Sequence, residues 1–141
     1  SGPFAKDLVK YTEKNERIIY KGVASNEDVV EAELKASLLV NPRPSREEFT
    51  RYSFPSKNIE YMVSGTPLLT TPLSGMPVEY YDYVYLFAEE TIEGYKATLE
   101  TILNLSSVEL YDKGKKARNF ILTKKNNVVQ AGRIIDFMNS N

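Results

Sequence analysis

Short runs of consecutive apolar residues alternate along this chain with segments in which apolar residues recur every three or four positions. The runs predict short strands at residues 17–20, 37–40, 67–71 and 84–87. The periodic segments predict helices over residues 4–15 and 127–139, and four more that begin near residues 25, 55, 92 and 106. Because strands alternate with helices, we expect an α/β fold with a parallel sheet, flanking helices and a helical C-terminal tail. The consecutive apolar residues at 38–40 further indicate a strand that is covered on both faces.

Side-chain spacing also predicts the buried faces of the helices and some of their ends. On the first two helices the residues expected to be buried are Phe4, Leu8, Val9 and Tyr11, and then Val29, Val30 and Leu34. The clearest helix is predicted to begin at Pro55 and to end before Gly65. Its expected buried stripe is Ile59, Met62 and Val63. Ser106 and Glu109 have the spacing of a capping box at the start of a later helix.

Composition narrows the chemistry that this chain can supply. Its 141 residues are about the length of one domain, and 18 Lys and Arg against 19 Asp and Glu leave a net charge of −1. That balance argues against a nucleic-acid partner, which usually selects a basic excess. With no Cys and no His, the chain lacks thiol and imidazole groups for catalysis, and we expect no metal site. No apolar run approaches the ~20 residues of a membrane helix, and the chain starts at Ser1 without a Met or a signal peptide. We therefore expect a cut N-terminus and a cytoplasmic setting.

Two features near the middle of the chain combine in one candidate site. The connection at residues 41–54 is long for a strand-to-helix loop in a compact α/β domain, and long loops are often functional. In the helix that follows, the backbone N–H groups of residues 56–58 can bind phosphate, and Lys57 adds a cation. Glu60 shares a helix face with Ser56 and Lys57, where its carboxylate can accept hydrogen bonds from two neighbouring hydroxyl groups. A solvated Lys57 and a surface-paired Glu60 are the alternatives.

The residues of this helix resemble a known motif. It is the nucleotide-sugar-binding motif of group 1 GT-B glycosyltransferases (family 4), and the matching segment is Phe54-Pro55-Ser56-Lys57-Asn58-Ile59-Glu60-Tyr61-Met62-Val63-Ser64-Gly65-Thr66-Pro67-Leu68-Leu69. Similar matches extend over nearly the whole chain, at residues 20–25, 37–42 and 87–91, and Ser1–Phe4 resembles a glycine turn after an earlier strand. The resemblance implies a Rossmann-like, three-layer parallel sheet, as in the C-terminal domain of these enzymes.

The resemblance implies a role for each residue of the candidate site. Glu60 would bind the ribose hydroxyls of a nucleotide-sugar, and Ser56 and Lys57 would lie beside its diphosphate. The donor-sugar pocket would be lined by Tyr52, Ser53, Phe54 and Pro55, and the base pocket would be bordered by Lys21, Gly22 and Val23. Tyr52 stands where the family often has a second Glu, so this position supplies no carboxylate to the sugar. No cofactor is implied, because the nucleotide-sugar is itself the donor substrate.

The resemblance also implies what the chain belongs to. Residues 1–141 would be one partial domain of an enzyme whose first domain precedes Ser1 and holds the acceptor site and the catalytic groups. The whole enzyme would transfer a sugar to a glycan or lipid-linked acceptor in bacterial surface polysaccharide biosynthesis, for capsule or lipopolysaccharide. It would associate peripherally with the inner face of the membrane, and its final helix would pack toward the first domain. This chain alone would carry no catalytic residue and would be inactive. The loss of early strands would leave a sheet edge exposed, through which the chain could form homo-oligomers.

A different class of function stays open. The chain could be a non-catalytic flavodoxin-like module, or a degenerate glycosyltransferase that acts through protein contacts, and nucleotide binding would separate these from the enzyme. Tyr80-Tyr81-Asp82-Tyr83 is either an aromatic platform for a sugar or, more commonly, a run that packs a loop against the sheet. The basic residues within 113–125 are either a contact for anionic lipid or a solvated charged face. The residues do not identify the base, the sugar, the acceptor or the stereochemistry of transfer.

Overall fold

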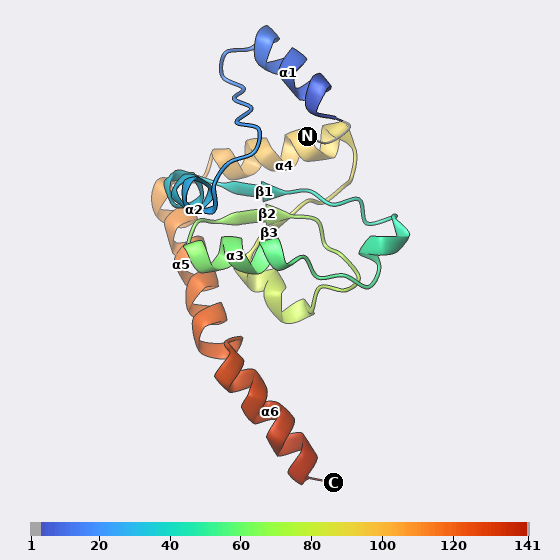
Figure 1. Ribbon diagram of the computed structural model, residues 1–141, viewed down its shortest axis with the longest axis vertical. Coiled ribbons are helices and arrows are strands. Elements are labelled where there is room, and N and C mark those ends of the chain that lie inside the picture. The colour runs from blue at the N-terminus through green and yellow to red at the C-terminus, as the bar shows by residue number, and fades with distance from the viewer. Residues whose placement is uncertain (1–3, 141) are drawn as a thin grey trace. The chain divides into compact units, whose positions relative to one another are not determined.

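The structure, a computed structural model, describes residues 4–140 (Figure 1). It divides the chain into two compact units, Ser1–Ala32 and Glu33–Asn141. The glycine turn expected at Ser1–Phe4 falls mainly on residues 1–3, which lie outside the described residues. The sheet belongs entirely to the second unit, which therefore contains the candidate site helix as well.

The first unit holds helix α1, Ala5–Lys14, and most of helix α2, Asn26–Lys35. The strand predicted at residues 17–20 is wrong, because these residues form neither helix nor strand and Ile19 is 75% exposed. Asn15 explains the difference. Its side-chain oxygen accepts the N–H of Arg17 at 3.0 Å, and its carbonyl oxygen accepts the N–H of Ile18 at 2.9 Å. N–H groups that a strand would pair with a neighbour are thus used locally, in a turn that follows α1.

The buried face predicted for α1 is also wrong, and of the three residues predicted for that of α2 only Val29 is half-buried. The four apolar residues expected on the buried side of α1 are all at least 43% exposed. On α2, Val30 and Leu34 are 43% and 58% exposed, whereas the charged residue Glu33 is only 7% exposed. Helical spacing reports that a helix is amphipathic, but the side that becomes covered depends on neighbours that spacing does not reveal.

The second unit is built on a three-stranded parallel sheet with the strand order β1-β2-β3. The strands are β1, Leu39–Asn41; β2, Leu68–Thr70; and β3, Tyr85–Leu86. Helix α3, Ser56–Ser64, connects β1 to β2, after a short 3₁₀ helix, η1, at Glu48–Thr50. A 3₁₀ helix, η2, at Val78–Tyr83 lies between β2 and β3. The parallel sheet predicted from alternating strands and helices is therefore confirmed.

Helices cover both faces of the sheet. Neighbouring residues of β2 point to opposite faces, and each packs against a different set of helices. Leu68 packs in one apolar cluster with Met62 of α3 and Ile121 of α5, Ser107–Lys124. Leu69 packs in a second cluster with Ile102 of α4, Ile92–Leu103. The second unit therefore has three layers, helices on each side of a parallel sheet, and is compatible with the expected Rossmann-like class.

The strands differ in how far they are covered. Leu68, Leu69 and Thr70 of the central strand β2 are fully buried. Val40 of the end strand β1 is 40% exposed, so the prediction that this strand is covered on both faces is wrong. An end strand has only one neighbour in the sheet, and consecutive apolar residues alone do not reveal that position.

Capping residues begin the last two helices, and the capping box of the first of these is the one that the sequence predicts. In α5 the N–H of Glu109 donates to Ser106 Oγ, and the N–H of Ser106 donates to the Glu109 carboxylate at 2.9 Å. Helix α6, Asn127–Asn139, begins after Asn126, whose side chain accepts the N–H of Val129. No residue of α6 is buried, and its apolar stripe is exposed. None of the described helices is long and apolar enough to cross a membrane.

Candidate functional site

The candidate site is built around α3, whose two ends are set by residues with restricted or special backbone conformations. Pro55 is the N-cap, one residue outside the helix position predicted for it, and its carbonyl oxygen accepts the N–H of Asn58 at 2.9 Å. Gly65 ends the helix with φ +82°, a left-handed conformation that favours glycine. Of the predicted buried stripe, Met62 is fully buried, Ile59 is half-buried and Val63 is 36% exposed.

A buried polar network fixes α3 to the sheet. Asn58 is 1% exposed, and its side-chain oxygen accepts a 2.6 Å hydrogen bond from the amide of Asn41 at the end of β1. The Asn58 amide nitrogen donates to Thr70 Oγ1 at 3.4 Å, and Thr70 donates to the Asn41 carbonyl oxygen at 2.9 Å. Because these groups satisfy one another, the network holds α3 against the carboxyl ends of β1 and β2. In open parallel sheets, ligands bind at this end, beyond the carboxyl ends of the strands.

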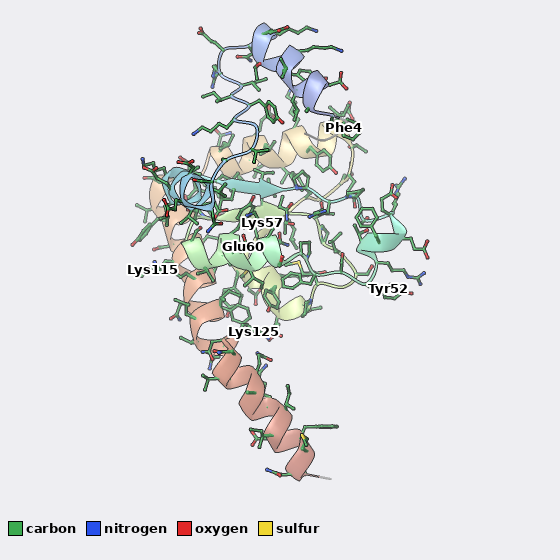
Figure 2. The ribbon with its side chains drawn as sticks, in the orientation of Figure 1. Phe4, Tyr52, Lys57, Glu60, Lys115 and Lys125 are labelled. Atoms are coloured by element: carbon green, nitrogen blue, oxygen red, sulfur yellow. The ribbon has the colours of Figure 1, made fainter. Side chains whose placement is uncertain are left out.

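Lys57 and Glu60 lie together on α3, less than one turn apart (Figure 2). Lys57 Nζ donates to Glu60 Oε2 at 2.8 Å and lies 3.5 Å from Oε1 of Glu33 on α2. The side chain of Glu60 is 55% exposed, whereas that of Glu33 is 9% exposed. The surface pairing that was the alternative interpretation of Glu60 is thus present, and more than half of its side chain remains open to a ligand.

The neighbouring carboxylates raise the pKa of Lys57 above its ordinary value. The hydrogen bond to Glu60 is the largest cause, burial acts in the opposite direction, and the charges of Glu60, Glu33 and Tyr61 add to the increase. Lys57 therefore keeps its positive charge throughout the neutral range. A permanent cation in the first turn of a helix is well placed to pair with a phosphate group near that N-terminus.

The residues expected around a donor sugar lead into the start of α3 but differ in exposure. Tyr52 is 82% exposed, and the guanidinium carbon of Arg51 lies 5.5 Å from the centre of its ring. Phe54 is half-buried, with its ring centre 4.6 Å from that of Tyr80. Ser53 and Pro55 are half-buried. Of these four residues, Tyr52 offers the largest free surface to a ligand.

The tyrosine run at residues 80–83 packs a loop against α5. Tyr80 is 6% exposed, and its ring meets Phe120 edge-on with 5.2 Å between the ring centres. Tyr83 stacks on the same phenylalanine at 4.1 Å, with 10° between the ring planes. The run therefore packs, as the commoner interpretation expects, but its rings lie on α5 rather than on a strand edge. Tyr80 belongs to the core, and Tyr83 packs against it.

A polar cleft of about 390 Å³ lies in the loops that follow β1 and β2. It is lined by Ser45, Arg46, Glu47, Glu48, Arg51 and Ser74. The long loop is tied to the segments after the other strands, because the N–H of Arg43 donates to Thr71 Oγ1 at 3.0 Å and that of Ser45 donates to Glu90 Oε2 at 2.9 Å. Guanidinium, carboxylate and hydroxyl groups together suit a polar ligand such as a sugar. Within residues 4–140, no group of three or more Asp or Glu side chains could hold a metal ion.

The residues expected at the base pocket belong to the first unit. Lys21, Gly22 and Val23 are exposed there, and Val23 is 90% exposed. Gly22 has φ +66°, so the chain turns at this point. The strand expected before this segment is absent, and the role of these three residues at a base pocket stays a prediction.

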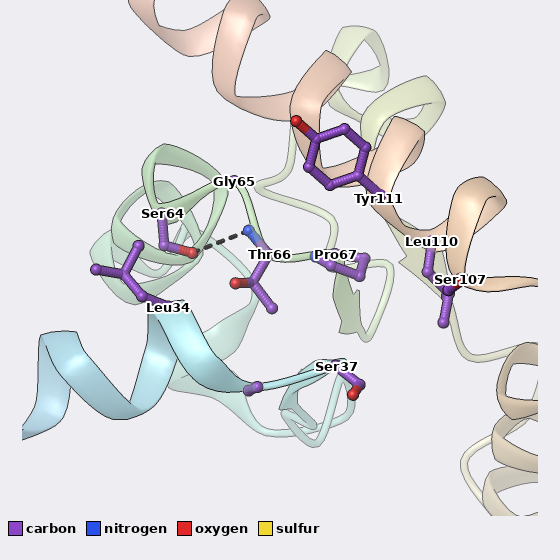
Figure 3. Close-up of a pocket in the computed structure, with 10 residues that line it drawn as sticks. Leu34, Ser37, Ser64, Gly65, Thr66, Pro67, Ser107, Leu110 and Tyr111 are labelled. Carbon is purple, nitrogen blue, oxygen red and sulfur yellow. Dashed lines mark hydrogen bonds between the residues drawn. The ribbon is translucent and has the colours of Figure 1, made fainter.

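A second cleft, of about 340 Å³, lies before the amino ends of β1 and β2. Figure 3 shows residues that line it. Its lining residues come before these two strands or from the start of α5, and they are Leu34, Ala36, Ser37, Ser64, Gly65, Thr66, Pro67, Ser107, Leu110 and Tyr111. Both hydrogen-bond donors of Thr66 are used within the protein, since its N–H donates to Ser64 Oγ at 3.1 Å and its hydroxyl donates to the Glu33 carbonyl oxygen at 2.7 Å. This cleft does not include any residue of the predicted site.

Two residues of the site, Asn58 and Glu33, escape the sequence analysis. Asn58 carries a detectable signal, because it lies four residues before Met62 and therefore on the buried face of α3. Glu33 carries none, since it is one of several acidic residues in its segment. Its surroundings depend on Lys57 and Thr66, which lie far along the chain.

Comparison with known proteins does not add a family to this description. No family model, no curated protein and no solved structure matches the chain. The α/β fold with its parallel sheet therefore rests on the structure, and the resemblance to glycosyltransferases stays a prediction.

Proposed function

We propose that this chain supplies the nucleotide-sugar donor site of a GT-B type glycosyltransferase. The observation that carries the proposal is the position of α3, which is held by the Asn58 network at the carboxyl edge of a parallel sheet. An exposed carboxylate, Glu60, and a cation, Lys57, lie in the first turns of this helix. This combination suits a ligand that carries both hydroxyl groups and phosphates.

Each group has a chemical role in the proposal. The two oxygens of Glu60 accept hydrogen bonds from the 2′ and 3′ hydroxyls of the ribose. Lys57 and the first N–H groups of α3, at Ser56 and Lys57, face the diphosphate. The N–H of Asn58 is not available for this role, because it donates to the Pro55 carbonyl oxygen. The polar cleft at residues 45–51 receives the sugar, with Tyr52 at its border.

The reaction follows from the donor. A sugar leaves the nucleoside diphosphate for a glycan or lipid-linked acceptor, and negative charge grows on the departing diphosphate. A helix N-terminus and a lysine ammonium group stabilise that charge before and during bond cleavage. In this proposal the acceptor site and the remaining catalytic groups come from a further domain, so the chain alone binds donor without transferring sugar.

An NMR titration with UDP, GDP and ADP tests the donor site directly. We expect one nucleotide to shift the backbone signals of residues 56–60. Glu60→Gln should weaken the binding of that nucleotide at least about tenfold, because hydrogen bonds to a charged acceptor are lost. Glu100→Gln is the matched control, since Glu100 is also an exposed helical residue paired with a lysine, Lys96, at 3.7 Å. Glu100→Gln should bind the nucleotide with the same affinity as the wild type.

Two outcomes would contradict the donor site. One is the absence of shifts at residues 56–60 with all three nucleotides. The other is equal affinity in the wild type and in Glu60→Gln. A module that acts through protein contacts would then be favoured, because α6 exposes a stripe of apolar side chains of which Ile134, Phe137 and Met138 are 61–71% exposed.

A further inference from the structure

Lys57 lies between two carboxylates in very different surroundings. Its ammonium group makes a 2.8 Å hydrogen bond to Glu60, a usual length for a charge-assisted bond, and stands at the longer distance of 3.5 Å from Glu33. The Glu60 side chain is 55% exposed, whereas the Glu33 side chain is 9% exposed. An ammonium group has three donors and can serve both carboxylates, yet here it favours the exposed one.

Glu33 is incompletely satisfied in this arrangement. Its Oε1 atom is buried and has no hydrogen-bond partner among the described residues. Glu33 also lies in the last turn of α2, close to the end of the helix that disfavours negative charge. A buried carboxylate is stable only when it is paired with a cation and hydrogen-bonded. Lys57 is near enough to provide both, but its hydrogen bond goes to Glu60 instead.

A ligand at Glu60 would change this balance. A diol places its hydroxyl donors on the carboxylate oxygens of Glu60 and so competes with Lys57 for them. The released ammonium group needs to move by less than about 1 Å toward Glu33 to reach the length of a charge-assisted bond. That movement satisfies the buried oxygen atom, and the bond lost at Glu60 is replaced at Glu33.

We propose that Glu33 is a positioning residue for Lys57, which transfers its hydrogen bond from Glu60 to Glu33 when the hydroxyl groups of a ligand occupy the Glu60 carboxylate. The identity of the ligand, a ribose diol, rests on the proposed function, but the contact between Lys57 and Glu33 does not. The transfer keeps the ammonium group of Lys57 charged and paired with a carboxylate. Glu33 thereby favours ligands that carry both ribose hydroxyls over those that carry one.

A side-chain NMR titration of Lys57 tests the contact without any ligand. The charged or titratable groups that face its ammonium group are Glu60 and Tyr61 on α3 and Glu33 on α2. In Glu60→Gln we expect the pKa of Lys57 to stay above the ordinary lysine value, because Glu33 takes over. In Glu60→Gln/Glu33→Gln it should fall to that value or below it, because burial then outweighs the remaining charge. Equal pKa values in these two proteins would overturn the proposal.

Controls separate this contact from general effects on the helix or the fold. Glu27→Gln changes an exposed acid on the same helix as Glu33 and should leave the pKa of Lys57 unchanged. Stability offers an independent readout, since Lys57→Met leaves Glu33 buried without this cation. It should unfold at a lower urea concentration than the wild type, and Lys57→Met/Glu33→Gln should recover most of the loss. An absence of recovery would also overturn the proposal.

Nucleotide binding then tests the effect on specificity. UDP, GDP and ADP are each compared with their 2′-deoxyribose analogues in the wild type and in Glu33→Gln. We expect the preference for ribose to fall about fivefold in Glu33→Gln, a typical size for coupling between two contacts. A preference that disappears in Glu60→Gln but is unchanged in Glu33→Gln would overturn the inference and leave the donor site intact. If no nucleotide binds the wild type, the donor site fails, and the lysine titration alone decides the role of Glu33.

Discussion

At the scale of single residues, Gly114 shows how closely α5 approaches the turn between α3 and β2. A Cβ atom at this position would lie 2.0 Å from the carbonyl oxygen of Gly65 and 3.0 Å from the backbone nitrogen of Pro67. Both are backbone atoms, so relief requires α5 to move away from the turn. We expect Gly114→Ala to lower the free energy of unfolding by about 3 kcal/mol, as measured by urea denaturation.

Gly132 provides the matched control for this substitution. It also lies in a helix, α6, but apart from its chain neighbours and the backbone of α6 itself, no atom of residues 4–140 lies within 4 Å of the place its Cβ would take. Alanine is the better helix former by up to about 1 kcal/mol, so Gly132→Ala should leave stability unchanged or raise it slightly. If Gly114→Ala were as stable as Gly132→Ala, α5 could not approach the turn as closely as the structure describes.

The residues of the candidate site show what a sequence reveals at this scale. The end of α3 at Gly65 was predictable, because a helix C-cap is set by a few consecutive residues. The burial of Asn58 and Glu33 was not, since each depends on partners brought close by the fold: Asn41 and Thr70 for the first, Lys57 for the second. Local signals thus locate the helix, and long-range contacts decide which of its polar groups are free to bind a ligand.

At the scale of elements, the capping box of α5 links helix stability to pH. The pKa of Glu109 is lowered by its hydrogen bonds to the hydroxyl and then to the backbone N–H of Ser106. A carboxylate whose pKa is lower in the folded than in the unfolded protein stabilises the fold at pH values above its unfolded pKa, near 4.5. This contribution is lost as the pH falls through the pKa of the folded protein. Ser106→Ala should therefore lower the urea midpoint at pH 7, and its effect should shrink at pH 3.

Thr91, the N-cap of α4, is the control for this pH dependence. Its hydroxyl oxygen accepts the N–H of Gly94 at 3.0 Å, and the cap includes no reciprocal carboxylate. Thr91→Ala should lower the urea midpoint by a similar amount at pH 7 and at pH 3. If the penalty of Ser106→Ala were equally independent of pH, the bond between Ser106 and Glu109 would not account for the lowered pKa.

The elements also show where sequence patterns reach their limit. The helix at 127–139 has the predicted bounds and the helix at 92–103 begins where predicted, because side-chain spacing and caps act within one segment. The strand expected at 17–20 is absent, because a strand needs a neighbour and Asn15 binds the first N–H groups in a turn. A short apolar run is therefore a weaker signal than a long periodic one.

At the scale of the whole molecule, protection of backbone amides from hydrogen exchange is expected to be unequal. The core of the second unit lies around β2, where Leu68 and Leu69 are fully buried and the strand is paired on both sides. In α6 no residue is buried, and in α1 none of the described side chains is. Amides of β2 should exchange only through global unfolding, whereas those of α1 and α6 should exchange through local opening, about 1,000-fold faster or more.

Hydrogen exchange followed by mass spectrometry measures this difference in the intact chain. A urea series adds a test of mechanism, because exchange by global unfolding accelerates strongly with urea, whereas exchange by local opening hardly responds. We expect the first behaviour for peptides that contain β2 and the second for peptides from α1 and α6. Equal protection in all three would mean that the exposed apolar faces of α1 and α6 are covered in solution. That result would direct the search for a partner of this chain to those two helices.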